Sequence, residues 1–173
     1  MSNKQAFNAK FVSIFSADRY YRIYVIDNQI FFIRLGGQSI LRDALAHQFG
    51  LLGGIIGNYF KKKAEKKKDE LIQKIDLKTP MELLPAHKHN FKTNVMEFNT
   101  ISIDPISFIA THGPGVGFWK FQLSNNKKYK FQFEKNEDLK NALDILPNIF
   151  TTKIIIHVEW DENKKKYKKI NKK

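Results

Sequence analysis

Two short segments of this sequence carry side chains that often do chemistry. His87 and His89 form a His-x-His pair, and on an extended segment both rings would point the same way, as in a metal site. Lys88 between them would repel a cation, and the chain has no cysteine and no nearby carboxylate pair to complete the ligands. We therefore expect a polar loop or helix end there, and no bound metal.

The glycine-rich run His112-Gly113-Pro114-Gly115-Val116-Gly117 has the composition of a phosphate-binding loop. It lacks the Gly-x-Gly-x-x-Gly spacing, and the segment after it reads as a strand rather than a helix. No serine–histidine–acid order and no pair of carboxylates suggests a hydrolase. The sequence thus predicts a noncatalytic protein, with no catalytic residues and no cofactor.

A glycine-punctuated apolar segment followed by lysines interrupts the strand-like part of the chain, at about residues 38–88. At helical spacing one face carries Leu41, Leu45, Phe49, Leu52, Ile56 and Tyr59, and the opposite face is rich in glycine. Four interior glycines cost such a helix about 4 kcal/mol, so it needs a partner for its apolar face. The following helix, with Leu71, Ile72 and Ile75 on one face, is the expected partner, which predicts an inserted helical hairpin.

The same segment has two further interpretations. The uncharged window Ala44–Phe60 has 17 residues and contains polar side chains, whereas a bilayer span needs about 20 apolar residues. A helix lying in a membrane interface or docking a partner remains an alternative to the packed hairpin.

Positive charge is concentrated in two places. The chain carries a formal net charge of +13, and six lysines lie within 61–68 and seven within 161–173. Only four arginines occur, and lysine favours diffuse attraction to an anionic surface over two-pronged recognition of one phosphate. The plain alternative is that these lysines only confer solubility.

The rest of the chain has the two-residue alternation of β-strands. Asp27-Asn28 predicts a hairpin turn, Thr79-Pro80 predicts a helix start, and a helix from Asn136 should stop at Pro147. The expected strands are Phe7–Phe15, Tyr20–Ile26, Gln29–Leu35, Phe91–Asn94, Thr100–Asp104, Ile106–Ala110, Phe118–Leu123, Lys128–Phe133 and Thr152–Trp160.

The run Tyr21–Ile33, the glycine-rich insert with its lysines, and Leu83–Phe91 together resemble bacterial pleckstrin-homology-like (GRAM-type) domains. The resemblance implies an α+β, mainly β fold: an antiparallel barrel or sandwich with a C-terminal plugging helix at Leu139–Leu146. One domain would span residues 1–160, with a basic tail at 161–173. It also implies binding of membranes or proteins rather than catalysis. The basic spacing of Lys10, Arg19 and Arg22 does not match the phosphoinositide motif of such domains.

These observations predict a binding module on an anionic membrane surface or an acidic protein. The expected anionic-surface residues are Lys61, Lys62, Lys63, Lys66, Lys67 and Lys68, and the expected apolar contacts are Leu51, Leu52, Ile55 and Ile56. Self-association through the hairpin is one alternative, and nonspecific nucleic-acid binding, suggested by Lys128-Tyr129-Lys130-Phe131, is another. Without cysteine and without an apolar run in Met1–Lys10, a cytoplasmic location is expected, peripheral to the inner membrane face. No small-molecule substrate is indicated, and the oligomeric state stays open.

Overall fold

A computed structural model of the chain describes residues 4–13, 18–37, 66–106, 115–151 and 153–170. The class is α+β and mainly β, as predicted, and residues 66–76 form a helical segment. The other elements are, in chain order, β1 (Gln5–Phe11), β2 (Arg19–Ile26), β3 (Gln29–Gly37), α3 (Pro80–Leu83), the 3-10 turn η1 (Leu84–Ala86), β4 (Phe91–Asn94), η2 (Val95–Glu97), β5 (Phe98–Asp104), β6 (Gly117–Leu123), β7 (Lys128–Phe133), α4 (Asn136–Phe150), β8 (Ile154–Ile156), β9 (Val158–Asp161) and β10 (Lys166–Lys169).

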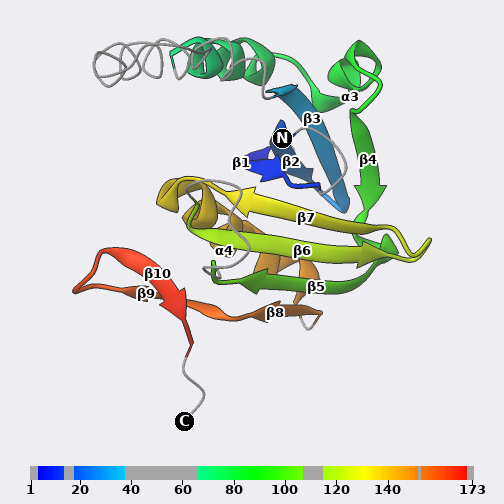
Figure 1. Cartoon of the computed structure of the whole chain (residues 1–173). Helices are drawn as coiled ribbons and strands as arrows, with labels where there is room; N and C mark the ends of the chain where they lie inside the picture. The colour runs from blue at the N-terminus through cyan, green and yellow to red at the C-terminus, as the bar shows by residue number, and fades with distance from the viewer. Residues whose placement is uncertain (1–3, 14–17, 38–65, 107–114, 152, 171–173) are drawn as a thin grey trace.

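Eight strands form one sheet in the order β4-β3-β2-β1-β7-β6-β5-β8 (Figure 1). All neighbours are antiparallel except β8, which runs parallel to β5. The prediction of an antiparallel barrel or sandwich is corrected in two respects: the sheet is mixed, and within the described residues β4 and β8 remain its open edges, so it does not form a closed barrel. The parallel pairing arises because α4 carries the chain back across the sheet before β8 begins.

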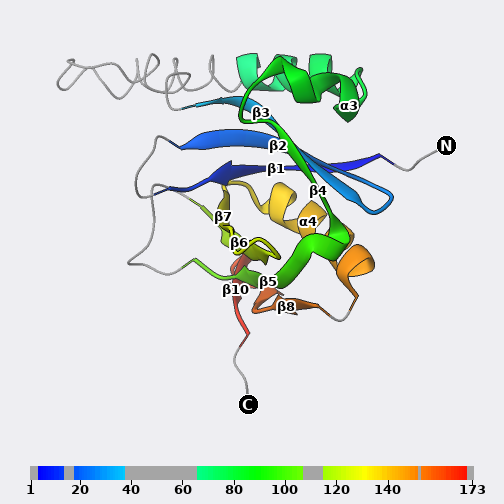
Figure 2. The same ribbon diagram turned by 90° about the vertical axis from the view of Figure 1, so that its right-hand side faces the viewer.

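The main core lies inside the bend of this sheet, where the strands β3 and β4 come close to β6 and β7 (Figure 2). Phe32 of β3 stacks on Phe91 with ring centroids 4.3 Å apart, and it also contacts Trp119 at 5.9 Å. From α4, Leu139 and Leu146 enter the same core and are fully buried. The alternating aromatic residues of the strands thus point inward, as their spacing predicts.

A second apolar cluster lies on the opposite face of β2 and β3. Tyr24, Phe31 and Ile33 are buried there beneath Leu83 of α3, and Ile75 of the helical segment packs against them. Asp76 connects this layer to the sheet, because its carboxylate accepts hydrogen bonds from Arg22 and from the Tyr24 hydroxyl. Residues 66–86 therefore cover a sheet face that would otherwise expose large apolar side chains.

Local signals set several element boundaries as expected. Asp27 adopts a left-handed conformation, with φ of 51°, in the turn between β2 and β3. The Thr79 side chain accepts from the Glu82 amide, and the Glu82 carboxylate accepts from the Thr79 amide, which makes a capping box before Pro80.

The C-terminal third differs from the sequence prediction in three places. α4 continues past Pro147 to Phe150, whose buried ring contacts Phe98 at 4.9 Å and offsets the helix hydrogen bond that proline removes. The N-cap of α4 is Lys135 rather than Asn136. The expected last strand is divided at His157 into β8 and β9, and part of the predicted basic tail forms β10, which pairs with β9.

Candidate anion-binding site

The end of β3 and the segment before β4 bring an arginine next to the two histidines. The Arg34 amide donates to the side-chain oxygen of Asn90 at 2.8 Å, and the Asn90 amide group donates to the carbonyl of Leu83 at 2.7 Å. The Tyr21 hydroxyl donates to the His89 carbonyl at 3.2 Å. These bonds hold the His-x-His segment against the ends of β2 and β3, so its position is fixed by the sheet.

The His87 ring lies within hydrogen-bonding reach of a donor at each of its two nitrogens. Arg34 Nη1 lies 2.5 Å from His87 Nε2, and the His89 amide nitrogen lies 3.0 Å from His87 Nδ1. A neutral imidazole has only one acceptor nitrogen, and a guanidinium and an amide can only donate. Either the Arg34 guanidinium or the His89 amide therefore faces the N–H group of the His87 ring, and that donor lacks an acceptor.

We call Arg19, Arg34, His87, Lys88 and His89 the arginine–histidine cluster. Partial burial, followed by the charges of Arg34 and Lys88, lowers the pKa of His87. Partial burial and the charges of Arg19 and Arg34 lower the pKa of His89. Both rings are therefore neutral near pH 7, and protonating either one is opposed by the cations beside it.

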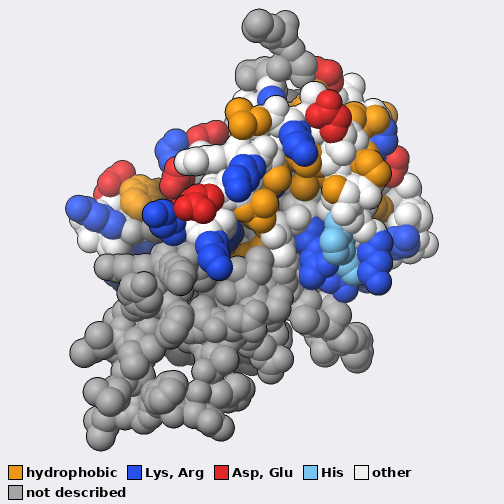
Figure 3. All heavy atoms as spheres, turned by 90° about the horizontal axis from the view of Figure 1, so that it is seen from above, with side chains coloured by type: hydrophobic (Ala, Val, Ile, Leu, Met, Phe, Trp, Pro, Cys, Tyr) orange, Lys and Arg blue, Asp and Glu red, His pale blue; other side chains and the backbone are white. Residues whose placement is uncertain are grey.

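Four members of the cluster, Arg34, Lys88 and the two histidines, have no carboxylate partner within the described part of the chain. No ion pair there joins Arg34, Lys88 or either histidine to an Asp or Glu side chain. Figure 3 shows histidine side chains surrounded by lysine and arginine side chains on this face. A ligand that supplies acceptor oxygens and negative charge, such as a phosphate or a carboxylate, matches this arrangement.

The lysines predicted to attract an anionic surface lie in different surroundings. Lys66 and Lys67 are exposed on the helical segment 66–76. Lys68 faces the protein: its ammonium lies 4.0 Å from Glu134 and 4.5 Å from the centre of the Tyr20 ring, and burial lowers its pKa. Seven predicted residues lie outside the described part of the chain: Leu51, Leu52, Ile55, Ile56, Lys61, Lys62 and Lys63.

The sequence predicted a polar loop or helix end at the histidines, without their arginine neighbours. A signal for Arg19 and Arg34 was available, because they stand at the two open ends of a predicted hairpin, and antiparallel pairing places those ends together. No comparable signal linked Arg34 to His87, since the two are 53 residues apart in the chain.

A second polar group lies at the far end of β5. Asp104 accepts from Ser102 at 2.7 Å, lies 2.7 Å from His157 Nδ1, and pairs with Lys120 at 3.1 Å. Burial opposes ionisation of Asp104, but the hydrogen bonds from His157, Ser102 and Lys120 together lower its pKa. Because the serine bonds to the carboxylate and not to the imidazole, this is not the nucleophile–base order of a hydrolase.

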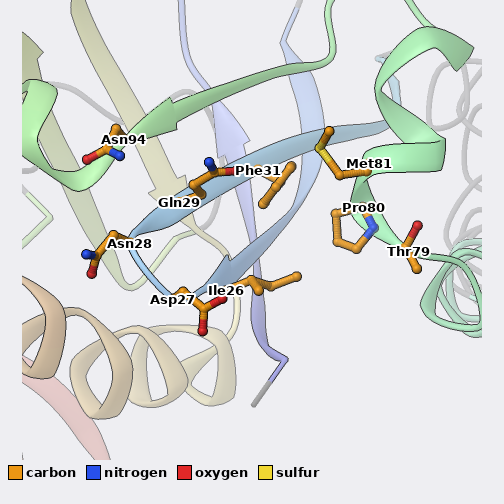
Figure 4. A pocket seen from close by; sticks show the side chains of 9 residues that line it. All are labelled: Ile26, Asp27, Asn28, Gln29, Phe31, Thr79, Pro80, Met81 and Asn94. Carbon is orange, nitrogen blue, oxygen red and sulfur yellow. The ribbon is translucent and has the colours of Figure 1, made fainter. Parts of the chain in front are cut away.

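A shallow crevice of about 410 Å³ separates the β2–β3 turn from the start of α3 (Figure 4). Its walls include the side chains of Asp27, Asn28 and Met81, and its single carboxylate has no second acid or histidine among the lining residues. Within the described residues no cluster of histidine and acidic side chains suits a metal ion, here or elsewhere. The crevice therefore offers little beyond amide hydrogen bonds.

The aromatic residues that suggested nucleic-acid stacking point into the core. Phe131 and Phe133 are fully buried, and Tyr129 packs against the same core, while Lys128 and Lys130 lie on the opposite face of β7. Stacking platforms need accessible rings, so this strand does not supply one.

Comparison with known proteins gives no relative: no protein-family model, no curated protein and no solved structure matches the chain. Among the described residues, none of the helices is both long enough and apolar enough to traverse a bilayer.

Proposed function

We propose that this chain is a noncatalytic binding module that associates with an anionic membrane surface through the arginine–histidine cluster. The observation that carries the proposal is the His87 ring, which meets N–H donors at both nitrogens beside Arg34 and Lys88, two cations that no described carboxylate pairs with. Lipid phosphate and carboxylate groups supply the missing acceptors and the opposite charge.

The proposal includes a pleckstrin-homology-like architecture. It is supported by four antiparallel strands, then three more, then a helix whose apolar face enters the core between the two groups. This order of elements is the one that the resemblance of Tyr21–Ile33 to pleckstrin-homology-like domains implies. The strands β8, β9 and β10 are additions beyond that plan.

The energies involved suffice for reversible association. A lysine or arginine close to an anionic leaflet contributes about 1 kcal/mol, so Arg19, Arg34 and Lys88 together contribute about 3 kcal/mol. The exposed Lys66 and Lys67 lie on the helical segment that, with α3, covers one side of the sheet (Figure 1), and they add about 2 kcal/mol if they reach the same leaflet. Such attraction weakens as salt screens it.

Cosedimentation with phosphatidylcholine vesicles, with and without phosphatidylserine, tests the proposal. The double variant Arg34→Gln/Lys88→Gln should bind the anionic vesicles about thirtyfold more weakly, because it removes two contributions of about 1 kcal/mol. The control Lys140→Gln/Lys164→Gln removes the same charge from exposed positions on α4 and on the β9–β10 turn. Equal losses in the two variants, or equal binding to both kinds of vesicle, would refute the proposal.

A further inference from the structure

The outer face of β5, β6 and β7 carries a second, separate group of lysines. In the pairing register Ser102, Lys120 and Lys130 lie side by side on the three strands, and Thr100, Gln122 and Lys128 form the next row. Lys153 lines the same groove, just before β8. We call Lys120, Lys128, Lys130 and Lys153 the lysine face.

This face is opposite the one on which α4 packs, and no described helix or strand covers it (Figure 1). Its residues line an open groove of about 730 Å³. Apolar side chains contribute to the groove as well, and Ile155 at the sheet edge is 58% exposed. The groove thus combines a cationic border with apolar contact area.

The charges on this face work against the stability of the sheet. Lys120 and Lys130 are direct cross-strand partners, and like charges in that position are destabilising. Burial and then the charge of Lys120 lower the pKa of Lys130. Asp104 pairs with Lys120 only, and within the described residues Lys128, Lys130 and Lys153 make no ion pair. A partner with negative charge would relieve this repulsion.

We propose that the lysine face binds an acidic polypeptide segment of a partner protein, a function beyond the membrane association proposed above. A groove is concave, so a planar bilayer reaches its rim and not its apolar interior, whereas a single chain segment fits inside it. Nucleic acid is disfavoured because the face has no accessible ring for stacking: Phe118 of β6 lies on it, but its ring is 2% exposed beneath the Lys130 ammonium, and the other aromatic residues of β6 and β7 pack against the core. Acidic side chains meet the lysines, and an apolar side chain contacts Ile155.

Fluorescence anisotropy with a labelled peptide tests this proposal. The probe alternates glutamate with serine around a central leucine, and a peptide with glutamine in place of glutamate is the uncharged control. The full chain should bind the acidic probe and not the control. The variant Lys120→Gln/Lys130→Gln should weaken binding about fivefold, as expected for two exposed ion pairs. The variant Lys74→Gln/Lys92→Gln makes the same charge change at exposed positions elsewhere and should bind as the native chain does.

Three results would overturn the proposal: no binding of the acidic probe, equal losses in the two double variants, or tighter binding of a single-stranded oligothymidylate that the Lys120→Gln/Lys130→Gln change abolishes. Thermal unfolding shows whether each variant is folded. Arg34→Gln/Lys88→Gln should bind the peptide normally and bind anionic vesicles about thirtyfold more weakly, so failure of either proposal is distinguishable from failure of the other.

Discussion

Replacing Asp76 with alanine tests whether the layer over residues 66–86 is part of the folding unit. Asp76 accepts from Arg22 at 2.9 and 3.2 Å and from the Tyr24 hydroxyl at 2.5 Å. Hydrogen bonds to charged groups contribute about 1.5–3 kcal/mol, and the Arg22–Asp76 pair is partly exposed, which favours the lower value. The Tyr24 hydroxyl, left without its acceptor, adds about 1 kcal/mol. We therefore expect Asp76→Ala to lower the free energy of unfolding by about 2.5 kcal/mol.

Urea unfolding, followed by the fluorescence of the buried Trp119, measures this loss. Tyr24→Phe is the matched control, because it removes one hydroxyl and keeps the buried ring, and it should cost about 1 kcal/mol. In the double variant the two losses should fall short of their sum by about 1 kcal/mol, the coupling of the shared hydrogen bond. A loss below about 0.5 kcal/mol for Asp76→Ala, or full additivity, would show that this carboxylate does not hold the layer to the sheet.

Three further predictions concern the core, a helix cap and pH. Phe32→Ala should lower the free energy of unfolding by about 3–5 kcal/mol, because the ring is fully buried and stacked; a loss under 2 kcal/mol in urea unfolding would contradict this packing. Thr79→Ala should cost about 1 kcal/mol by removing half of the capping box, while Thr79→Ser should restore most of it in the same assay. Binding to anionic vesicles should strengthen as pH falls from about 7.5 to about 5.5, since the depressed pKa values of His87 and His89 rise when an anion is bound, and binding then takes up protons. Removal of both rings by His87→Gln/His89→Gln should abolish this pH dependence and leave the salt dependence.

Much of the sheet was predictable because its signals are local. The alternation in Lys128–Phe133 and the Asp27-Asn28 turn each depend on neighbouring residues, and the structure confirms both elements. The second apolar cluster also left a signal that was not used. Ile23–Ile26 and Ile30–Ile33 are apolar at consecutive positions, which indicates strands buried on both faces and so requires a covering layer.

The remaining features depend on contacts between distant parts of the chain. The mixed sheet follows from where α4 returns the chain, and no residue of β8 alone specifies a parallel partner. The β9–β10 hairpin was not predicted because its lysines are typical of a solvated tail. In the structure the rings of Trp160 and Tyr167 are in contact across it, with centroids 5.0 Å apart. The arginine–histidine cluster likewise forms only when the fold brings β3 next to the residues that follow η1 in the chain.

The internal pairing of acidic side chains determines where the excess positive charge of the chain lies. Described carboxylates are largely committed to internal partners: Asp76 to Arg22, Glu134 to Lys10 and Lys68, and Asp138 to the backbone and side chain of Asn8. All three pairings connect separate elements of the fold, and those of Asp76 and Glu134 also neutralise cations that belong to neither positive surface. Because these acidic side chains are paired internally, the positive charge of the chain, +13 in total, is unevenly distributed. Besides the lysines of 61–68 and 161–173, positive charge gathers at the arginine–histidine cluster and on the lysine face, two surfaces of different shape. Different partners for the two surfaces follow from that difference in shape, since charge alone would attract the same anions to both.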